Sequence, residues 1–139
     1  REIYYFKVQK TAFPRIIVQG SIHGREHITA LLILKLIKDF NKKGKNGTVY
    51  FVPLVNPDGV EISQTKTPLY KANARGVDLN VNFDALWGMG KSNLRVKGDE
   101  NYIGPYPFSE KETKALRDFT YKINPSGTLS FHSKGQVIY

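Results

Sequence analysis

Residues that commonly bind metals stand close together near the start of the chain, in His23-Gly24-Arg25-Glu26-His27. His23 and Glu26 are three positions apart, so one helical turn would place both side chains on the same face, within reach of one ion. A catalytic zinc is held by three protein ligands and keeps a fourth position for water, and two histidines with one glutamate form a known ligand set. The pattern therefore predicts part of a zinc site that needs one more histidine.

His132 is the candidate for the missing ligand. It lies in Leu129-Ser130-Phe131-His132-Ser133, an apolar run that predicts a strand leading into a loop. Open α/β sheets bind ligands beyond the carboxyl ends of their strands. The chain has no cysteine, so zinc must use histidine and carboxylate. We therefore expect one Zn²⁺ per chain, held by His23, Glu26 and His132.

A rival pattern fits the same pentad. In H-x-x-E-H sites both histidines bind zinc, the glutamate is the base, and an acidic residue downstream is the third ligand. Glu100 is available for that role. However, such a motif belongs inside a helix, whereas residues 16–20 predict a strand that ends just before the pentad. The rival also leaves His132 without a role, so we expect His27 to pack at the start of the helix or to support a ligand from behind.

Five segments spread over almost the whole chain resemble the zinc carboxypeptidase family, the carboxypeptidase A-like metallopeptidases. The first is the strand and the first metal-binding residues (15–26), and the second is an Asn-Pro-Asp-Gly turn (55–59). The third is the block Ala-Arg-Gly-Val-Asp-Leu-Asn-Val-Asn-Phe (74–83). A segment leading into a helix (102–110) and Ser-Phe-His-Ser (130–133) complete the set. The resemblance implies a zinc-dependent peptidase that hydrolyses peptide bonds through a metal-activated water.

The resemblance also suggests residues that contact the substrate. In the family, the block containing Asn80 binds the terminal carboxylate of the substrate with an amide and with an arginine at the next position. A guanidinium matches a carboxylate through two parallel hydrogen bonds. This chain has Val81 at that position, which places carboxylate anchoring in question. Lys71 and Arg75 are nearby cations, and either one would polarise the scissile carbonyl oxygen or hold a carboxylate instead.

The family takes its general base, a glutamate, from a strand well after the third metal ligand. The chain ends at Tyr139, seven residues after His132, so we expect the base beyond Tyr139. Residues 1–139 are thus read as one carboxypeptidase-like domain truncated at both ends, which binds metal but turns over little peptide alone. Residues 71–78 resemble the bacterial branch that cleaves γ-D-glutamyl-diamino acid bonds of cell-wall peptides. The alternative is a catalytically inactive zinc-containing module that binds peptides or wall fragments.

Composition narrows the range of partners. The 139 residues carry a formal net charge of +9, but the 21 basic residues are spread along the chain without an RNA-binding aromatic signature. We therefore expect peptide or cell-wall peptide substrates and no nucleic acid. No run of 18 apolar residues is present, which predicts no membrane span. An extracellular or cell-envelope location is slightly favoured over the cytoplasm, but the sequence fixes neither the compartment nor the oligomeric state.

Alternating strand and helix patterns predict an α/β fold with a mixed, largely parallel twisted sheet flanked by helices, corresponding to the amino-terminal part of a carboxypeptidase-like domain. The expected strands span residues 1–8, 15–20, 48–55 and 128–131. A helix over 27–40 is apolar nearly all round and should pack hard on the sheet. Ser109 and Glu112 form a capping-box pattern for a helix ending near Lys122. Residues 56–59 predict a turn, and 61–76 and 88–107 predict loops.

Overall fold

The computed structural model describes residues 1–98 and 100–134 of the chain. Four strands, three α-helices and two short 3-10 turns make up its named elements. In chain order they are β1 (Phe6–Gln9), β2 (Arg15–Gly20), η1 (Gly24–Glu26), α1 (Ile28–Lys43), β3 (Thr48–Val52), α2 (Pro57–Thr65), η2 (Leu79–Val81), α3 (Lys111–Ile123) and β4 (Gly127–Phe131).

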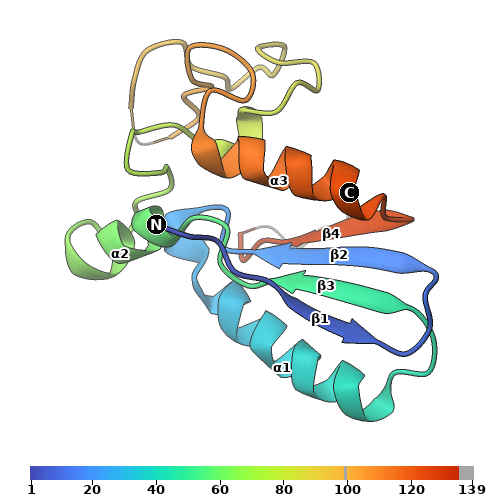
Figure 1. Ribbon diagram of the computed structural model, residues 1–139. Helices are drawn as coiled ribbons and strands as arrows, with labels where there is room; N and C mark the ends of the chain where they lie inside the picture. The colour runs from blue at the N-terminus through green and yellow to red at the C-terminus, as the bar shows by residue number, and fades with distance from the viewer. Residues whose placement is uncertain (99, 135–139) are drawn as a thin grey trace.

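The strands form one sheet with the order β1-β3-β2-β4. β2 runs parallel to both β3 and β4, and β1 is antiparallel to β3. Helix α1 connects β2 to β3, and α3 precedes β4, which are the crossovers that parallel strands require. Figure 1 shows α1 on one face of the sheet and α3 on the other. The expected mixed, largely parallel α/β fold is confirmed.

The core has one cluster on each face of the sheet, because neighbouring residues of a strand point to opposite sides. Facing α3, Ile17 and Val52 pack with Leu116. Facing α1, Val18 and Phe51 pack with side chains of that helix, chiefly Ile33. All five residues of β3 are buried, as expected for a strand covered on both faces.

Helix α1 extends three residues beyond the predicted end but packs less completely than the sequence suggested. Thr29 and Ile33 are buried, and three more apolar side chains pack partly on the sheet. The other apolar positions are exposed by 41% to 60% of their surface, namely Ile28, Leu31, Leu32 and Leu34. The expectation of close packing is therefore wrong for this face: a helix presents one stripe to a flat sheet, and its opposite stripe faces away from the sheet.

Three expected boundaries differ from the structure. The first strand occupies Phe6–Gln9, so the prediction over residues 1–5 is wrong. β3 ends at Val52, before Pro53, because proline cannot donate to a strand ladder. The predicted turn and the start of the following loop form helix α2 instead. Proline at the first helical position is favourable when the preceding asparagine caps the helix, and Asn56 does so.

The predicted capping box of α3 does not form. The cap position belongs to Glu110, which makes no capping bond with its side chain. The hydroxyl of Ser109 lies 3.0 Å from the amide nitrogen of Asn82 and donates to the carboxylate of Glu110 at 2.8 Å. Tertiary hydrogen bonds therefore take the hydroxyl that the local pattern assigned to the helix. The helix ends at Ile123, where Asn124 adopts the left-handed conformation that favours asparagine.

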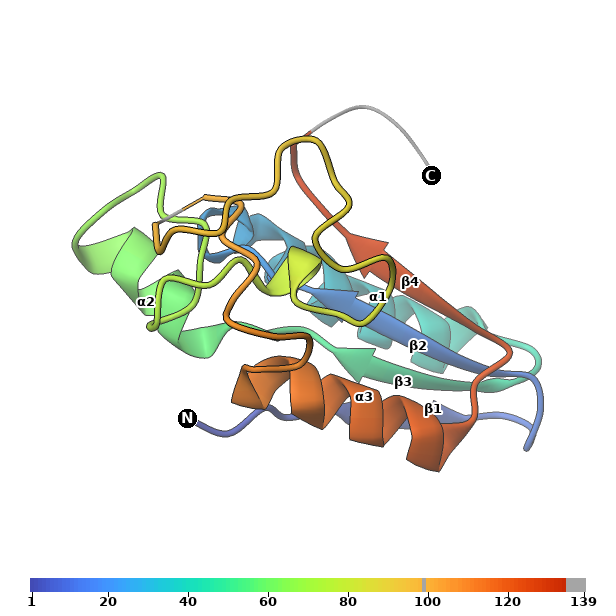
Figure 2. The same ribbon diagram turned by 90° about the horizontal axis from the view of Figure 1, so that it is seen from above.

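The parallel strands all finish at one end of the sheet. Figures 1 and 2 show α2 and the long segment between η2 and α3 gathered at that end. The described residues of this segment form an isolated bridge between Leu94 and Tyr102 but no named strand or helix, in agreement with the loop predicted for 88–107. Among the described residues, no helix has the length and apolar character needed to cross a membrane.

Candidate metal centre

The metal pentad begins immediately after β2, where the chain turns sharply. Ser21 is buried and has a φ of 53°, a conformation that costs energy for a residue other than glycine. Its backbone N–H donates to Thr29 Oγ1 at 2.8 Å, and the Thr29 hydroxyl donates to the Glu26 carbonyl at 2.8 Å. Thr29 thus ties the strand end to the η1 turn, which places His23 and Glu26 side by side.

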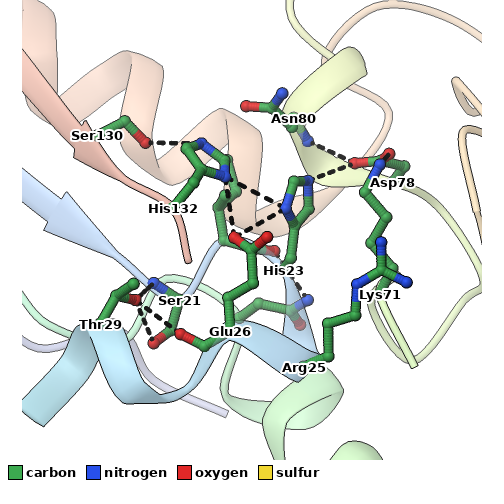
Figure 3. Close-up of polar contacts among 12 residues, drawn as sticks. Ser21, His23, Arg25, Glu26, Thr29, Lys71, Asp78, Asn80, Ser130 and His132 are labelled. Carbon is green, nitrogen blue, oxygen red and sulfur yellow. Dashed lines mark hydrogen bonds and ion pairs between the residues drawn. The ribbon is translucent and has the colours of Figure 1, made fainter. Parts of the chain in front are cut away.

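His132 arrives from the far end of the chain through strand pairing. The register of β2 and β4 sets Phe131 opposite Gly20, so both strands end at the same level. His132 follows directly and lies beside His23, from which it is 109 residues distant in sequence. The close-up in Figure 3 shows His132, the candidate third ligand, beside His23 and Glu26 at the strand end.

Three potential ligand atoms converge on one point. Glu26 Oε2 lies 3.1 Å from His23 Nδ1 and 2.9 Å from His132 Nδ1, and the two imidazole nitrogens are 3.3 Å apart. Ligand atoms on a tetrahedral zinc, at about 2.0–2.1 Å from the ion, would be roughly 3.3 Å from one another. Of the described residues, these three form the one group suited to holding a metal ion. The donor set and its spacing fit zinc.

The surroundings favour a negative charge on Glu26. The glutamate is 3% exposed, and this burial alone would raise its pKa. Hydrogen bonds with His132 and His23 outweigh the burial and hold the pKa of the Glu26 carboxyl well below its usual range. Two imidazole nitrogens and a carboxylate oxygen at these distances are held together either by imidazole N–H protons or by a bound metal ion.

Asp78 supports the side of His23 that faces away from this point. Its Oδ1 lies 3.3 Å from His23 Nε2, and its Oδ2 lies 2.6 Å from Lys71 Nζ. Metal-binding histidines usually donate their second ring nitrogen to a carboxylate, which fixes the ring and its tautomer. The sequence interpretation gave Asp78 no part in the site. A signal was nevertheless available: a metal-binding histidine needs an acceptor for its second ring nitrogen, and a nearby aspartate is a natural candidate.

The remaining predicted contacts divide between two places. Lys71 joins the centre through Asp78 and is 14% exposed in its side chain. Asn80 follows in the η2 turn, where its backbone N–H donates to Asp78 Oδ1 at 3.0 Å. Arg75, by contrast, is 70% exposed in its side chain and pairs with the buried Glu110 at 3.3 Å. The structure therefore brings Lys71 and Asn80, but not Arg75, into contact with the residues around the metal ligands.

The residues of the rival zinc pattern are placed elsewhere. Glu100 forms an ion pair with Arg25 rather than turning toward the ligand atoms. His27 stands between η1 and α1 and makes no side-chain capping bond. The group of converging ligand atoms contains His132 and neither of these two residues. The arrangement thus favours the first ligand set over the H-x-x-E-H alternative.

Zinc affinity is expected to rise as the pH is increased from about 6 to about 8, because zinc binds the neutral imidazole and must displace its proton. Burial alone would lower the pKa of His23, but its hydrogen bonds with Asp78 and Glu26 raise it above the ordinary value. More of the protein therefore carries a proton on His23 near neutrality than an unperturbed histidine would. Titration calorimetry in buffers of different ionisation enthalpy should detect proton release. Zinc binding without proton release near pH 6 would contradict this assignment.

Comparison with known proteins gives relatives that are zinc carboxypeptidases and related peptidases. Residues 1–139 match the sequence profile of a family described as zinc carboxypeptidase. The γ-D-glutamyl-L-diamino acid endopeptidase 1 of Lysinibacillus sphaericus is 30% identical over 161 residues, covering 90% of this chain and 41% of that protein. The chain therefore spans less than half the length of this relative.

Solved structures agree with the sequence comparison. Carboxypeptidase A from Helicoverpa armigera superimposes with a TM-score of 0.87 at 25% identity, covering 97% of this chain and 38% of that one. Murein-tripeptide amidase from Escherichia coli O157 gives a TM-score of 0.67 at 27% identity, covering 93% of this chain and 55% of that one. With the match over its full length, the chain belongs to the zinc carboxypeptidase family of hydrolases.

Proposed function

We propose that this chain forms the zinc-binding part of a peptidase, with His23, Glu26 and His132 holding one Zn²⁺. The convergence of these three side chains, from the turn after β2, from η1 and from the residue after β4, is the observation that carries the proposal. Bound zinc would supply an activated water and a polarised carbonyl group. The protein keeps the ligands in place through the Asp78 carboxylate on His23 and the Thr29 hydroxyl at the carbonyl of Glu26.

Lys71 is proposed as the cation that contacts the substrate oxygen. Its ammonium group lies 2.6 Å from Asp78 Oδ2 and 2.9 Å from Asn101 Oδ1. Asp78 also contacts the imidazole of His23, so it links Lys71 to this candidate ligand. A flexible side chain with three donors is able to keep one bond to Asp78 while another reaches an oxygen near the metal. Val81 brings no charge of its own to this region, so Lys71 also supplies positive charge for a substrate carboxylate.

The general base is proposed to lie outside residues 1–139. Glu26 is occupied by two histidines, and Asp78 is occupied by His23 and Lys71. Carboxylates engaged in these contacts orient the neighbouring side chains, so we assign neither of them to the attacking water. We therefore propose that a carboxylate from another segment serves as the base in the complete protein.

We propose cell-wall peptides with γ-D-glutamyl-diamino acid bonds as the substrate class, with ordinary peptides as the competing class. The similarity to an endopeptidase named for γ-D-glutamyl-L-diamino acid bonds and to an amidase named for murein tripeptides supports this choice. Hydrolysis of both classes by the zinc-loaded complete protein tests it. Zinc binding without hydrolysis of either class would favour the alternative, an inactive module that binds peptides or wall fragments.

Replacing Lys71 with methionine in the complete protein is expected to lower kcat/KM by about 10²–10³-fold, the usual effect of losing one donor to a developing oxyanion. Zinc affinity should change much less, because Lys71 does not touch a ligand atom. Steady-state kinetics with a zinc titration of the same preparation measure both. Arg75→Met provides the comparison: a larger loss for Arg75→Met than for Lys71→Met would transfer the role to Arg75.

A further inference from the structure

Asn56, the first residue of the Asn-Pro-Asp-Gly segment, is fully buried at the meeting point of three parts of the chain. Its backbone N–H donates to the carbonyl of Ser21 at 3.0 Å. Its side-chain oxygen accepts the N–H of Gly59 at 2.9 Å and so caps helix α2. These two bonds explain a structural role, but they leave the side-chain NH₂ group unaccounted for.

The two protons of that NH₂ group join the segments that carry the proposed functional residues. Asn56 Nδ2 donates to the carbonyl of Ile22 at 3.1 Å and to the carbonyl of Ala72 at 3.0 Å. Ile22 directly precedes His23, and Ala72 directly follows Lys71. One amide group therefore spans the gap between the strand end that supplies the first metal ligand and the segment that supplies the proposed oxygen-binding cation.

Close backbone packing completes this connection. The N–H of Gly24 donates to the carbonyl of Lys71 at 2.9 Å. A Cβ on Gly24 would lie 2.3 Å from the Gly59 carbonyl oxygen and 2.9 Å from that of Tyr70, and neither backbone group is able to move away cheaply. The absence of a side chain at this position thus lets the ligand turn, α2 and residues 70–72 approach one another.

We propose that Asn56 is a positioning residue, whose side-chain amide sets the place of Lys71 relative to the metal ligands. The inference rests on the proposed function insofar as Lys71 contacts the substrate. The metal ligands themselves have other supports, since Thr29 holds the Glu26 carbonyl and Asp78 holds His23. Loss of the Asn56 donors should consequently disturb Lys71 more than it disturbs metal binding.

Asn56→Asp separates the two roles of the residue. The aspartate retains an oxygen that caps α2, because aspartate and asparagine are comparable caps. It replaces the NH₂ donor by an oxygen that faces the carbonyls of Ile22 and Ala72 and repels both. Should this variant fail to fold, Asn56→Ser is the substitute. Its hydroxyl oxygen is still able to cap α2, but its side chain is shorter and carries one donor proton in place of two. Asn124→Ala serves as the stability control, because it disfavours the left-handed end of α3 away from the metal centre.

Hydrogen exchange of zinc-loaded residues 1–139 gives a direct result that needs no activity. In Asn56→Asp the Gly24 amide should exchange at least about tenfold faster, since its bond to the Lys71 carbonyl loosens. The amides within β2 and β3 should change no more than in Asn124→Ala, and the zinc Kd should stay within about threefold of the original. An unchanged exchange rate of the Gly24 amide would overturn the proposal. A rise in the zinc Kd by as large a factor as the rise in that exchange rate would overturn it too.

A double-mutant cycle in the complete protein tests whether Asn56 acts through Lys71. Asn56→Asp alone should lower kcat/KM at least about tenfold, whereas in the Lys71→Met background it should have no further effect. Equal losses in both backgrounds would contradict a role through Lys71. If Lys71→Met itself has no effect, the proposed function of Lys71 fails, while the exchange experiment still decides whether Asn56 positions that segment.

Discussion

Replacing His132 with alanine is expected to weaken zinc binding at least about tenfold, or roughly 1.4 kcal/mol. His132 Nδ1 lies 2.9 Å from Glu26 Oε2 and 3.3 Å from His23 Nδ1, so its loss leaves a two-ligand site. The polar contacts of the His132 side chain are with His23, Glu26 and Ser130, so the fold should persist without them. Titration calorimetry on the variant measures the effect directly.

His27→Ala is the matched comparison for His132→Ala, because it removes an imidazole from the same region without removing an atom of the ligand group. The structure predicts that His27→Ala keeps its zinc affinity. Retention of zinc by His132→Ala, combined with its loss in His27→Ala and Glu100→Ala, would establish the rival H-x-x-E-H site instead.

Replacing Asp78 with alanine is expected to lower zinc affinity by about 10- to 100-fold, the usual range when a residue that orients a metal ligand is removed. The carboxylate is fully buried, with one oxygen near His23 Nε2 and the other on Lys71 Nζ. Its removal frees the imidazole to rotate and leaves Lys71 without its ion-pair partner. Burial alone would raise the pKa of Asp78, but His23 and Lys71 lower it, so the lost group is a carboxylate ion.

Asp78→Asn is the control for shape. The amide oxygen is still able to accept from His23 Nε2 and from the Asn80 backbone, so the η2 turn should remain. Its zinc affinity should fall between those of the original protein and Asp78→Ala, with circular dichroism confirming that all three are folded. An Asp78→Ala protein that is folded and binds zinc with the original affinity would remove Asp78 from the centre.

The candidate ligands His23 and His132 were accessible from the sequence because each follows a recognisable apolar run. β2 ends just before His23, and β4 ends just before His132. Parallel strands finish at one edge of a sheet, so two strand ends predict one site even across 109 residues. The mixed α/β fold followed from the same alternation of strands and helices.

Other features depended on contacts that no local pattern contains. Asp78 lies at the start of η2 and contacts His23 across 55 positions of sequence, an approach that tertiary packing decides. Ser109 matched a helix cap but is used by Asn82 and Glu110. Asn56 was taken for part of a turn, because Asn-Pro-Asp-Gly suits a turn and the start of a helix equally well.

Long-range surroundings also decided which apolar residues are buried. The sequence of α1 is apolar on almost every side, and periodicity alone does not tell which stripe meets the sheet. Ile33 is fully buried, while Leu31 is 60% exposed. The partner of a charged residue is likewise not fixed by its sequence neighbours. Arg75 was grouped with Lys71 because the two are close in sequence, yet Arg75 pairs with Glu110.

The most direct test of the account is the coordination of zinc in the purified chain. After loading and dialysis, elemental analysis should give one zinc per chain, and X-ray absorption at the zinc edge should show two imidazole ligands with oxygen ligands completing the shell. His132→Ala should lose one imidazole from this spectrum, and His27→Ala should leave it unchanged. Two imidazoles in the spectrum of His132→Ala, or the loss of one in His27→Ala, would contradict the assignment of His23, Glu26 and His132.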